Sequence, residues 1–188
     1  MKIEWKIDKL LAPLPAALVS CGTMKKANVL TVSWTGFLNS EPLMTYVAIR
    51  PSRYSYRLIK RGKSFVINIP NKKLLHCVDV CGLKSGKDTD KFAECGITAV
   101  ESKMVSAPSI LECPISIECE VCDILKNPSH DAFIAKVKTI TIDDQYMEGR
   151  KFNFVKAGLI MSAHRQYFEV GDFLADTFYT AQENSKSK

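Results

Sequence analysis

The sequence lacks any hydrophobic run long enough to cross a membrane as a helix. Its longest apolar stretch near the N-terminus, residues 10–19, contains Pro13 and Pro15, whereas a membrane-spanning helix needs about 20 apolar residues. The stretch follows the charged Lys9 and has no signal-peptide pattern. We therefore expect no membrane partner.

Two common phosphate-binding motifs are also missing. No GxGxxG follows a predicted strand and no GxxxxGK[ST] occurs, which excludes a Rossmann dinucleotide site and a P-loop. The net charge is only +6, from 26 Lys and Arg against 20 Asp and Glu, and the basic residues are scattered. This favours a small anionic ligand or an acidic partner, and we expect no nucleic acid.

The seven cysteines show no metal-site arrangement. Cys119 and Cys122 lie three apart on a predicted strand and therefore point to opposite faces. Cys77 and Cys81 lie four apart on a predicted helix and share its apolar face. An odd cysteine count without an export signal indicates free thiols in a reducing cytoplasm, so we expect a cytoplasmic protein with no metal.

The remaining composition is that of one globular domain. Hydrophobic residues make up 46% of the 188 residues and charged residues 24%, and this length buries roughly 70% of the unfolded surface in one core. We expect a domain over residues 1–181 and a mobile tail over residues 182–188. Six strands are predicted, over residues 17–21, 29–34, 44–49, 64–69, 115–125 and 132–142.

Three short helices lie between these strands. Ser52 can cap a helix through Lys60 that Gly62 ends, and Asn71 can cap residues 72–81, with Gly82 as the stop. Asp88 or Thr89 can open a turn through Glu94 that Gly96 ends. Helices that do not alternate regularly with strands argue against a doubly wound parallel sheet. The expected fold is mainly β, an antiparallel barrel with peripheral helices.

The stretch over residues 28–35 alternates strictly between apolar and hydroxyl side chains. One face carries Leu30, Val32 and Trp34, and the other carries Thr31, Ser33 and Thr35. Three hydroxyls on one face are consistent with a pocket for a ligand rich in acceptors. The same pattern is consistent with a half-exposed strand, because Thr is a good strand former.

Two basic segments follow this strand. Residues 50–57 combine arginines and hydroxyls with a helix start, which suits a phosphate, although a capped helix with a solvated basic face has the same pattern. Residues 81–92 form a Gly- and Lys-rich loop in which Lys84 or Lys91 can face a phosphate or a flavin edge. A solvated loop is the alternative.

Taken together in order, the motifs resemble the flavin reductase-like FMN-binding family, and within it the flavoredoxin branch. They are Pro13-x-Pro15-Ala16-Ala17-Leu18-Val19-Ser20, Asn28-x-x-Thr31-x-Ser33-Trp34, Glu41-Pro42-Leu43, Arg50-Pro51-Ser52-Arg53-Tyr54-Ser55, Phe65-Val66-Ile67-Asn68-Ile69-Pro70, the loop from Cys81-Gly82 to Lys91-Phe92, Ser129-His130-Asp131 and Tyr167-Phe168-x-x-Gly171. The resemblance implies a split β-barrel, a six-stranded antiparallel Greek-key barrel with short peripheral helices.

The resemblance also implies FMN, bound without covalent attachment at the interface of a homodimer. Its phosphate would lie near Arg53 and Ser55, its ring along residues 28–35, and His130 over the reactive side of the ring as the catalytic residue. The cofactor-binding residues implied are Asn28, Leu30, Thr31, Val32, Ser33, Trp34, Thr35, Ala48, Arg53, Tyr54, Ser55, Lys91 and His130.

Two of these residues have alternative interpretations. The usual Gly-Asp-His of the family reads Pro128-Ser129-His130 here, and a lone His beside a turn is often a surface or capping residue. Trp34 either stacks near the cofactor or fills the barrel. Its alternation with Leu30 and Val32 favours core packing of the side chain, so we expect a mixed role in which the Trp34 backbone meets the cofactor. No role is assigned to His76 or His164.

Three alternative functions are consistent with the sequence and the family resemblance. The first is an FMN oxidoreductase or electron carrier of flavoredoxin type, with a redox protein as electron donor. The second is a flavin reductase with NAD(P)H as donor. The third is a non-redox β-barrel binding module, which would expose aromatic residues among basic ones on a strand face; no strand here has that pattern.

Overall fold

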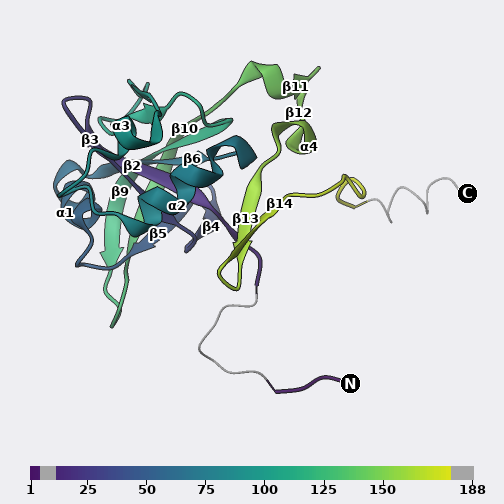
Figure 1. The fold of residues 1–188 in the computed structure, drawn as a ribbon, viewed down its shortest axis with the longest axis horizontal. Helices are drawn as coiled ribbons and strands as arrows, with labels where there is room; N and C mark the ends of the chain where they lie inside the picture. The colour runs from purple at the N-terminus through teal and green to yellow at the C-terminus, as the bar shows by residue number, and fades with distance from the viewer. Residues whose placement is uncertain (5–11, 179–188) are drawn as a thin grey trace, which may run out of the picture.

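The structure is a computed structural model that describes residues 1–4 and 12–178. The tail expected over residues 182–188 lies outside the described residues. The main sheet has seven strands in the order β3-β2-β6-β9-β10-β5-β4, and every neighbouring pair is antiparallel (Figure 1). These strands are β2 (Ala17–Thr23), β3 (Lys26–Val32), β4 (Thr35–Ser40), β5 (Leu43–Ile49), β6 (Ser64–Ile69), β9 (Ile115–Leu125) and β10 (Asp131–Ile142).

The helices and short strands surround this sheet. The helical elements are α1 (Tyr54–Gly62), η1 (Lys72–Leu74), α2 (Leu75–Leu83), α3 (Lys91–Cys95), η2 (Asp144–Tyr146) and α4 (Phe154–Ala157). The short strands are β1 (Leu14–Pro15), β7 (Ala99–Val100), β8 (Ser109–Ile110), β11 (Met147–Glu148), β12 (Lys151–Phe152), β13 (Ile160–Ala163) and β14 (Gln166–Glu169). None of the described helices is long and apolar enough to cross a membrane.

Strand β2 is buried on both faces because separate cores lie against them. Val19 and Cys21 pack with Tyr56 and Ile59 of α1 in the first core. Leu18, on the opposite face, belongs to a second core with residues of α2 and α3. The sheet is thus held between α1 on one side and α2 and α3 on the other, which explains the continuous apolar run in β2.

The expected closed barrel of six strands is not what the structure has. The sheet has seven strands and its hydrogen-bond ladder is open, with β3 and β4 at the edges. The sequence interpretation omitted β4 because its residues are mostly exposed and lack an apolar alternation. Only Ser33 and Trp34 separate the ends of the two edge strands, so the edges meet at this corner without pairing.

The predicted element boundaries are close to those observed. The expected strands over residues 64–69 and 115–125 are confirmed as β6 and β9. Gly96 ends α3 in the left-handed region at φ 62°, as expected. Gly82, however, does not end α2, which continues to Leu83, and the segment begins with the 3-10 turn η1 capped by Asn71.

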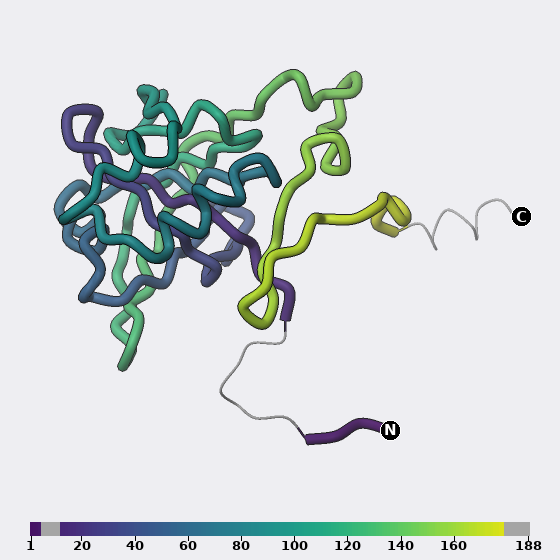
Figure 2. The backbone as a smooth tube through the Cα atoms, viewed as in Figure 1, coloured from purple at the N-terminus to yellow at the C-terminus, as the bar shows by residue number. Residues whose placement is uncertain are grey.

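The C-terminal part of the described chain stands to one side of the main sheet. Figure 2 shows the hairpin of β13 and β14, in yellow-green, beside the main body of the molecule and next to the purple segment that begins at residue 12. The hairpin completes a small sheet with β1, where Leu14 lies opposite Ser162. Several large apolar side chains beyond it are exposed, including Phe173 and Leu174.

Candidate functional site

A cavity of about 460 Å³ lies where the start of α1 faces the loop after α2. Four cationic side chains line it and, among the described residues, no acidic one does. The lining residues are Leu30, Arg50, Ser52, Arg53, Tyr54, Ser55, Lys84, Ser85, Gly86 and Lys91. Such a concentration of positive charge favours a compact anion. We call this space the cationic cavity.

The N-terminus of α1 contributes backbone donors to the cationic cavity. The N-cap residue Arg53 is extended, makes no side-chain cap, and no acidic residue occupies the first turn. The first N–H groups of a helix have no partner within it, so they and the helix dipole favour an anion. The Arg53 N–H donates to the Arg50 carbonyl over 3.0 Å, which keeps both arginines at this helix end.

Ser55 is held in the cavity wall by Asn28. The Asn28 amide donates to the Ser55 hydroxyl over 2.6 Å, and Asn28 itself is only 5% exposed. Gly86 lies so close to this amide that a Cβ at Gly86 would come within 1.8 Å of Asn28 Oδ1. Asn28 therefore lies behind the cavity as a support, and only glycine leaves room for it at position 86.

Lys91 is the buried cation of the cavity, with 4% of its surface exposed. Its Nζ donates to the carbonyls of Val29 and Cys81, each over 2.9 Å. Burial lowers the pKa of Lys91 below its ordinary value; the Cys81 thiol acts in the opposite direction and Arg53 lowers the pKa further. A cation held by neutral acceptors beside a second cation is stabilised by an anion bound between them.

A second cavity of about 180 Å³ adjoins the first and shares Leu30, Arg50 and Arg53 with it. Its lining runs along the end of β3 and the two residues after it, and β5 adds Ala48. The lining residues are Leu30, Thr31, Val32, Ser33, Trp34, Ala48, Arg50, Arg53 and His130. We call it the strand cavity.

The hydroxyl groups expected to face a ligand already have protein partners. Thr31 donates to the Val78 carbonyl, and the hydroxyls of Ser33 and Ser162 are 3.0 Å apart. Thr35 donates to the Tyr46 carbonyl over 2.5 Å and lines neither cavity. These hydroxyls therefore join β3 to α2, the corner after β3 to β13, and β4 to β5. Strand alternation alone does not show which hydroxyls are already paired.

Trp34 does not pack in the core, contrary to the expectation from its alternation with Leu30 and Val32. Strand β3 ends at Val32, so the alternation stops before Trp34, which is 42% exposed. Its carbonyl accepts from the Ala48 N–H over 2.9 Å, and its ring lies 4.4 Å from that of His130 between centroids. The indole therefore forms a wall of the strand cavity.

His130 lies beside Trp34 in the wall of the strand cavity, directly before β10. Its Nε2 is 3.3 Å from the Arg50 Nε and its Nδ1 is 2.9 Å from the Ser129 hydroxyl. Because Arg50 can only donate, Nε2 accepts and the proton of the neutral ring is on Nδ1. Partial burial lowers the pKa of His130, and the charges of Arg50 and Arg53 lower it further.

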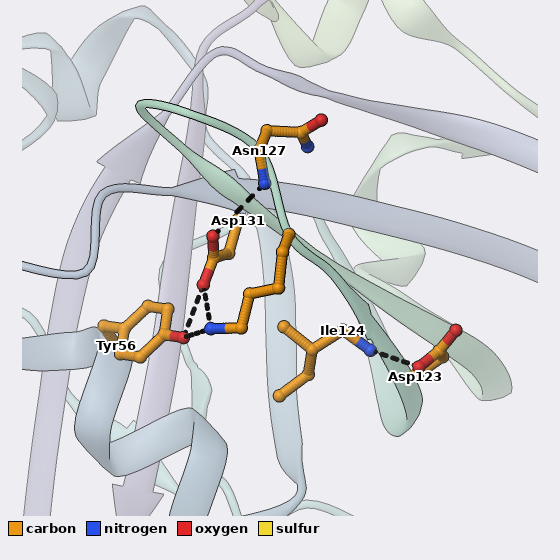
Figure 3. Close-up of polar contacts among 6 residues, drawn as sticks. Tyr56, Asp123, Ile124, Asn127 and Asp131 are labelled. Carbon is orange, nitrogen blue, oxygen red and sulfur yellow. Dashed lines mark hydrogen bonds and ion pairs between the residues drawn. The ribbon is translucent and has the colours of Figure 1, made fainter.

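A buried carboxylate fixes the turn that carries His130. Asp131 accepts from the Tyr56 hydroxyl over 2.6 Å and from the Asn127 N–H over 3.4 Å (Figure 3). The Lys126 ammonium also donates to Asp131, with 2.5 Å between Nζ and Oδ2. The hydrogen bond from Lys126 lowers the pKa of Asp131 most, and the one from Tyr56 lowers it further. Tyr56 belongs to α1, so this contact ties the His130 turn to the helix whose start lines the cationic cavity.

All of the residues proposed from the sequence line one of the two cavities except Asn28 and Thr35. The sequence interpretation did not commit to five further lining residues, which are Arg50, Ser52, Lys84, Ser85 and Gly86. Arg50, Ser52 and Lys84 lie in segments already singled out as basic, so their charge and position were the available signal. Ser85 and Gly86 gave no signal beyond a loop rich in Gly and Lys.

Comparisons with known proteins agree with this arrangement. A protein of Pyrococcus abyssi is 36% identical over 178 residues, which cover 93% of this chain and 98% of that protein. Flavoredoxin of Desulfovibrio vulgaris (Miyazaki F) superposes with a TM-score of 0.90 at 29% identity, covering 96% of this chain and 100% of that one. Flavoredoxin from Methanosarcina acetivorans gives 0.88 at 26% identity, covering 98% and 99%.

The profile of one family, described as the flavin reductase like domain, matches residues 11–169. The match spans both cavities and all the elements that form them. The chain therefore belongs to the flavin reductase like family.

Proposed function

We propose that the chain binds FMN without covalent attachment and passes electrons through it, as an electron carrier of flavoredoxin type. The observation that carries this proposal is the cationic cavity, where four cations meet with no acidic residue in the described lining, opening into the strand cavity. The family match and the two flavoredoxin neighbours support flavin as the ligand.

The cationic cavity suits the phosphate of FMN. Arg53, Ser55 and the first N–H groups of α1 supply directed donors, and Lys91 supplies a buried charge that lacks an anionic partner in the described lining. Donors fixed in this way lose little freedom when an anion binds. Arg50, Lys84 and Ser85 complete the proposed phosphate site.

The strand cavity suits the flat ring of the flavin. The residues proposed to line the ring are Leu30, Thr31, Val32, Ser33, Trp34, Ala48 and His130. When bound, FMN supplies the redox chemistry, while the protein positions it and limits its contact with water. Asn28 and Thr35 act indirectly, since Asn28 orients Ser55 and Thr35 joins β4 to β5.

His130 is proposed as the residue that exchanges a proton at the ring. Its lowered pKa keeps the imidazole neutral at pH 7, with the proton on Nδ1 and Nε2 facing Arg50. Arg50 holds the ring in this tautomer, and Asp131 holds the turn in place. The two guanidinium groups disfavour a second proton on the imidazole, so negative charge entering the cavity would favour proton uptake by His130.

The second candidate is an NAD(P)H-dependent flavin reductase, favoured by the exposed indole of Trp34 at the strand cavity. Because Trp34 is 42% exposed, its indole is available to pack against the nicotinamide ring of a bound nucleotide. Mixing the FMN-loaded protein with NADH or NADPH in a stopped-flow instrument separates the candidates. Bleaching of the flavin by either nucleotide identifies a reductase, and no bleaching with both identifies a carrier reduced by a redox protein.

The class of function is tested first by the visible absorption spectrum of the purified protein. Flavin bands that are released by heat and match FMN rather than FAD are expected. A colourless protein that takes up no added FMN would contradict the proposal and favour a non-redox binding module.

Two further features belong to this proposal. We propose a homodimer, supported by the exposed apolar side chains of the C-terminal segment, among them Phe154, Val170 and Phe173. We also propose a cytoplasmic location, supported by seven free thiols of which Cys122 is exposed.

A further inference from the structure

Cys81 and Cys95 lie together behind the cationic cavity. Cys81 belongs to α2 and Cys95 is the last residue of α3, and their Sγ atoms are 3.9 Å apart. We propose that the two thiols form a redox-active pair that oxidises to an intramolecular disulfide. Formation of this bond does not depend on the proposed function.

The geometry requires only a small movement. A disulfide needs the sulfurs at about 2.05 Å, and the thiols already face each other across the α2–α3 contact. Cys77 is the nearest competitor, but its thiol donates to the Cys95 carbonyl over 3.3 Å and so is directed at the backbone.

The two thiols differ in their access to a reagent. Cys95 is partly exposed, whereas Cys81 is only 1% exposed and lies behind it. Cys113, in the same core, is buried. A small oxidant therefore reaches Cys95 first and Cys81 second, which is the order that an attacking and a resolving cysteine require.

A small-molecule disulfide, such as oxidised glutathione, is the chemical class of oxidant. The Cys95 thiol loses its proton to solvent and attacks one sulfur of the reagent, so that a mixed disulfide forms and the first glutathione thiolate leaves. Cys81 then loses its proton and attacks the Cys95 sulfur, which forms the Cys81–Cys95 bond and releases the second glutathione. The cysteines lose two electrons, and the reagent gains them as two thiols.

The bond would close the loop that forms one wall of the cationic cavity. Residues 82–94 lie between the two cysteines and include Lys84, Ser85 and Lys91, which line the cavity. Lys91 also donates to the Cys81 carbonyl over 2.9 Å, so the backbone at Cys81 contacts the buried cation of the cavity directly. Cross-linking removes freedom from this loop and holds its cavity-lining side chains in place.

The test uses the full chain carrying Cys122→Ser, because that exposed thiol would otherwise form its own mixed disulfide. The protein is incubated with oxidised glutathione, remaining thiols are alkylated, and the intact mass and peptide map are measured. The expected product has lost two hydrogen atoms and contains a Cys81–Cys95 peptide pair. A mixed disulfide on Cys95 without ring closure, no loss of thiols, or a Cys77–Cys95 pair would each overturn the proposal.

Three variants serve as controls in the same background. Cys77→Ser should still form the bond, whereas Cys95→Ser should form none and Cys81→Ala should stop at the mixed disulfide. Circular dichroism checks that each variant folds. If the buried change Cys81→Ala prevents folding, Cys95→Ser, at a partly exposed site, still tests the proposal. Burial raises the pKa of the Cys81 thiol, so its thiolate is a small fraction at neutral pH, and ring closure should accelerate about tenfold per pH unit between about pH 7 and 9.

The effect on the cavity rests on the proposed function and is measured separately, as the rate of FMN release from oxidised and reduced protein. We expect release to slow about fivefold on oxidation, the effect of ordering one flexible side chain in advance. Unchanged or faster release would refute the loop effect alone. If neither form binds FMN, the proposed function fails, while the peptide map still decides the disulfide.

Discussion

At the scale of single residues, Lys91 is the strongest indication that the cationic cavity binds an anion. It is buried, its two acceptors are neutral carbonyls, and Arg53 lies near enough to lower its pKa. An isolated buried ammonium is costly unless a counter-charge is present. The proposed phosphate in the cationic cavity would supply that counter-charge, which explains a buried ammonium at this position.

Lys91 predicts a specific pH dependence of stability without FMN. Because its folded pKa is lowered from 10.5, the folded protein binds fewer protons than the unfolded chain between the lowered pKa and 10.5. The unfolding free energy contributed by this group should therefore rise with pH across that window. Urea unfolding of the wild type and of Lys91→Met at several pH values measures it as the difference between the curves. A difference that is constant or falls with pH would be inconsistent with a strained buried ammonium.

Arg50 predicts the titration of His130. Its guanidinium is the nearer of two charges that, after burial, lower the pKa of the imidazole. Arg50→Met should raise the His130 pKa toward about 6.5, and NMR of labelled histidines measures it among only three histidines. Arg57→Met, an exposed position later in α1, is the matched control and should leave the pKa of His130 unchanged. Equal shifts of the His130 pKa in both variants would show that Arg50 has no specific effect on His130.

At the scale of elements, the loop after α2 depends on Gly86. Any Cβ there would meet the Asn28 amide, which is buried and holds Ser55. Gly86→Ala should lower the unfolding free energy by about 1–3 kcal/mol, the usual cost of overpacking, and weaken FMN binding. Chemical denaturation and FMN titration measure both.

Gly62, at the end of α1, is the matched control for Gly86. A Cβ there would meet nothing within 4 Å, so Gly62→Ala should change stability by at most about 1 kcal/mol, and toward higher stability. A Gly86→Ala protein as stable as Gly62→Ala would show that the close approach to Asn28 can relax freely.

The elements also show how far the sequence alone could be interpreted. Strands β6 and β9 were predicted to the residue because apolar patterns and turn residues mark both ends. Strand β4 was missed, since an exposed edge strand needs no apolar face. The alternation with Leu30 and Val32 favoured core packing for the Trp34 side chain, because periodicity does not reveal where a strand ends. Lys84 and Ser85 come close to α1 only in the folded chain, so the sequence could not show that they line the same cavity.

At the scale of the whole molecule, the exposed apolar side chains of the C-terminal segment predict self-association. Phe173 is 70% exposed and lines a surface cavity with Phe154 and Val170. Phe173→Glu should convert a dimer to a monomer in sedimentation velocity experiments. Leu111→Glu, at a site that is 61% exposed and does not line this surface cavity, should remain dimeric. A monomeric wild-type protein, or equal behaviour of both variants, would argue against this interface.

The central claim is that the cationic cavity binds the phosphate of FMN. The most direct measurement compares the affinities for FMN and riboflavin, which differ by that phosphate alone, in the wild type and in Arg53→Ala/Ser55→Ala. The wild type should prefer FMN by about a hundredfold or more, the value of two charge-assisted hydrogen bonds, and the double variant should lose most of this preference. Equal affinities for FMN and riboflavin in the wild type, or an undiminished preference in the variant, would contradict the account.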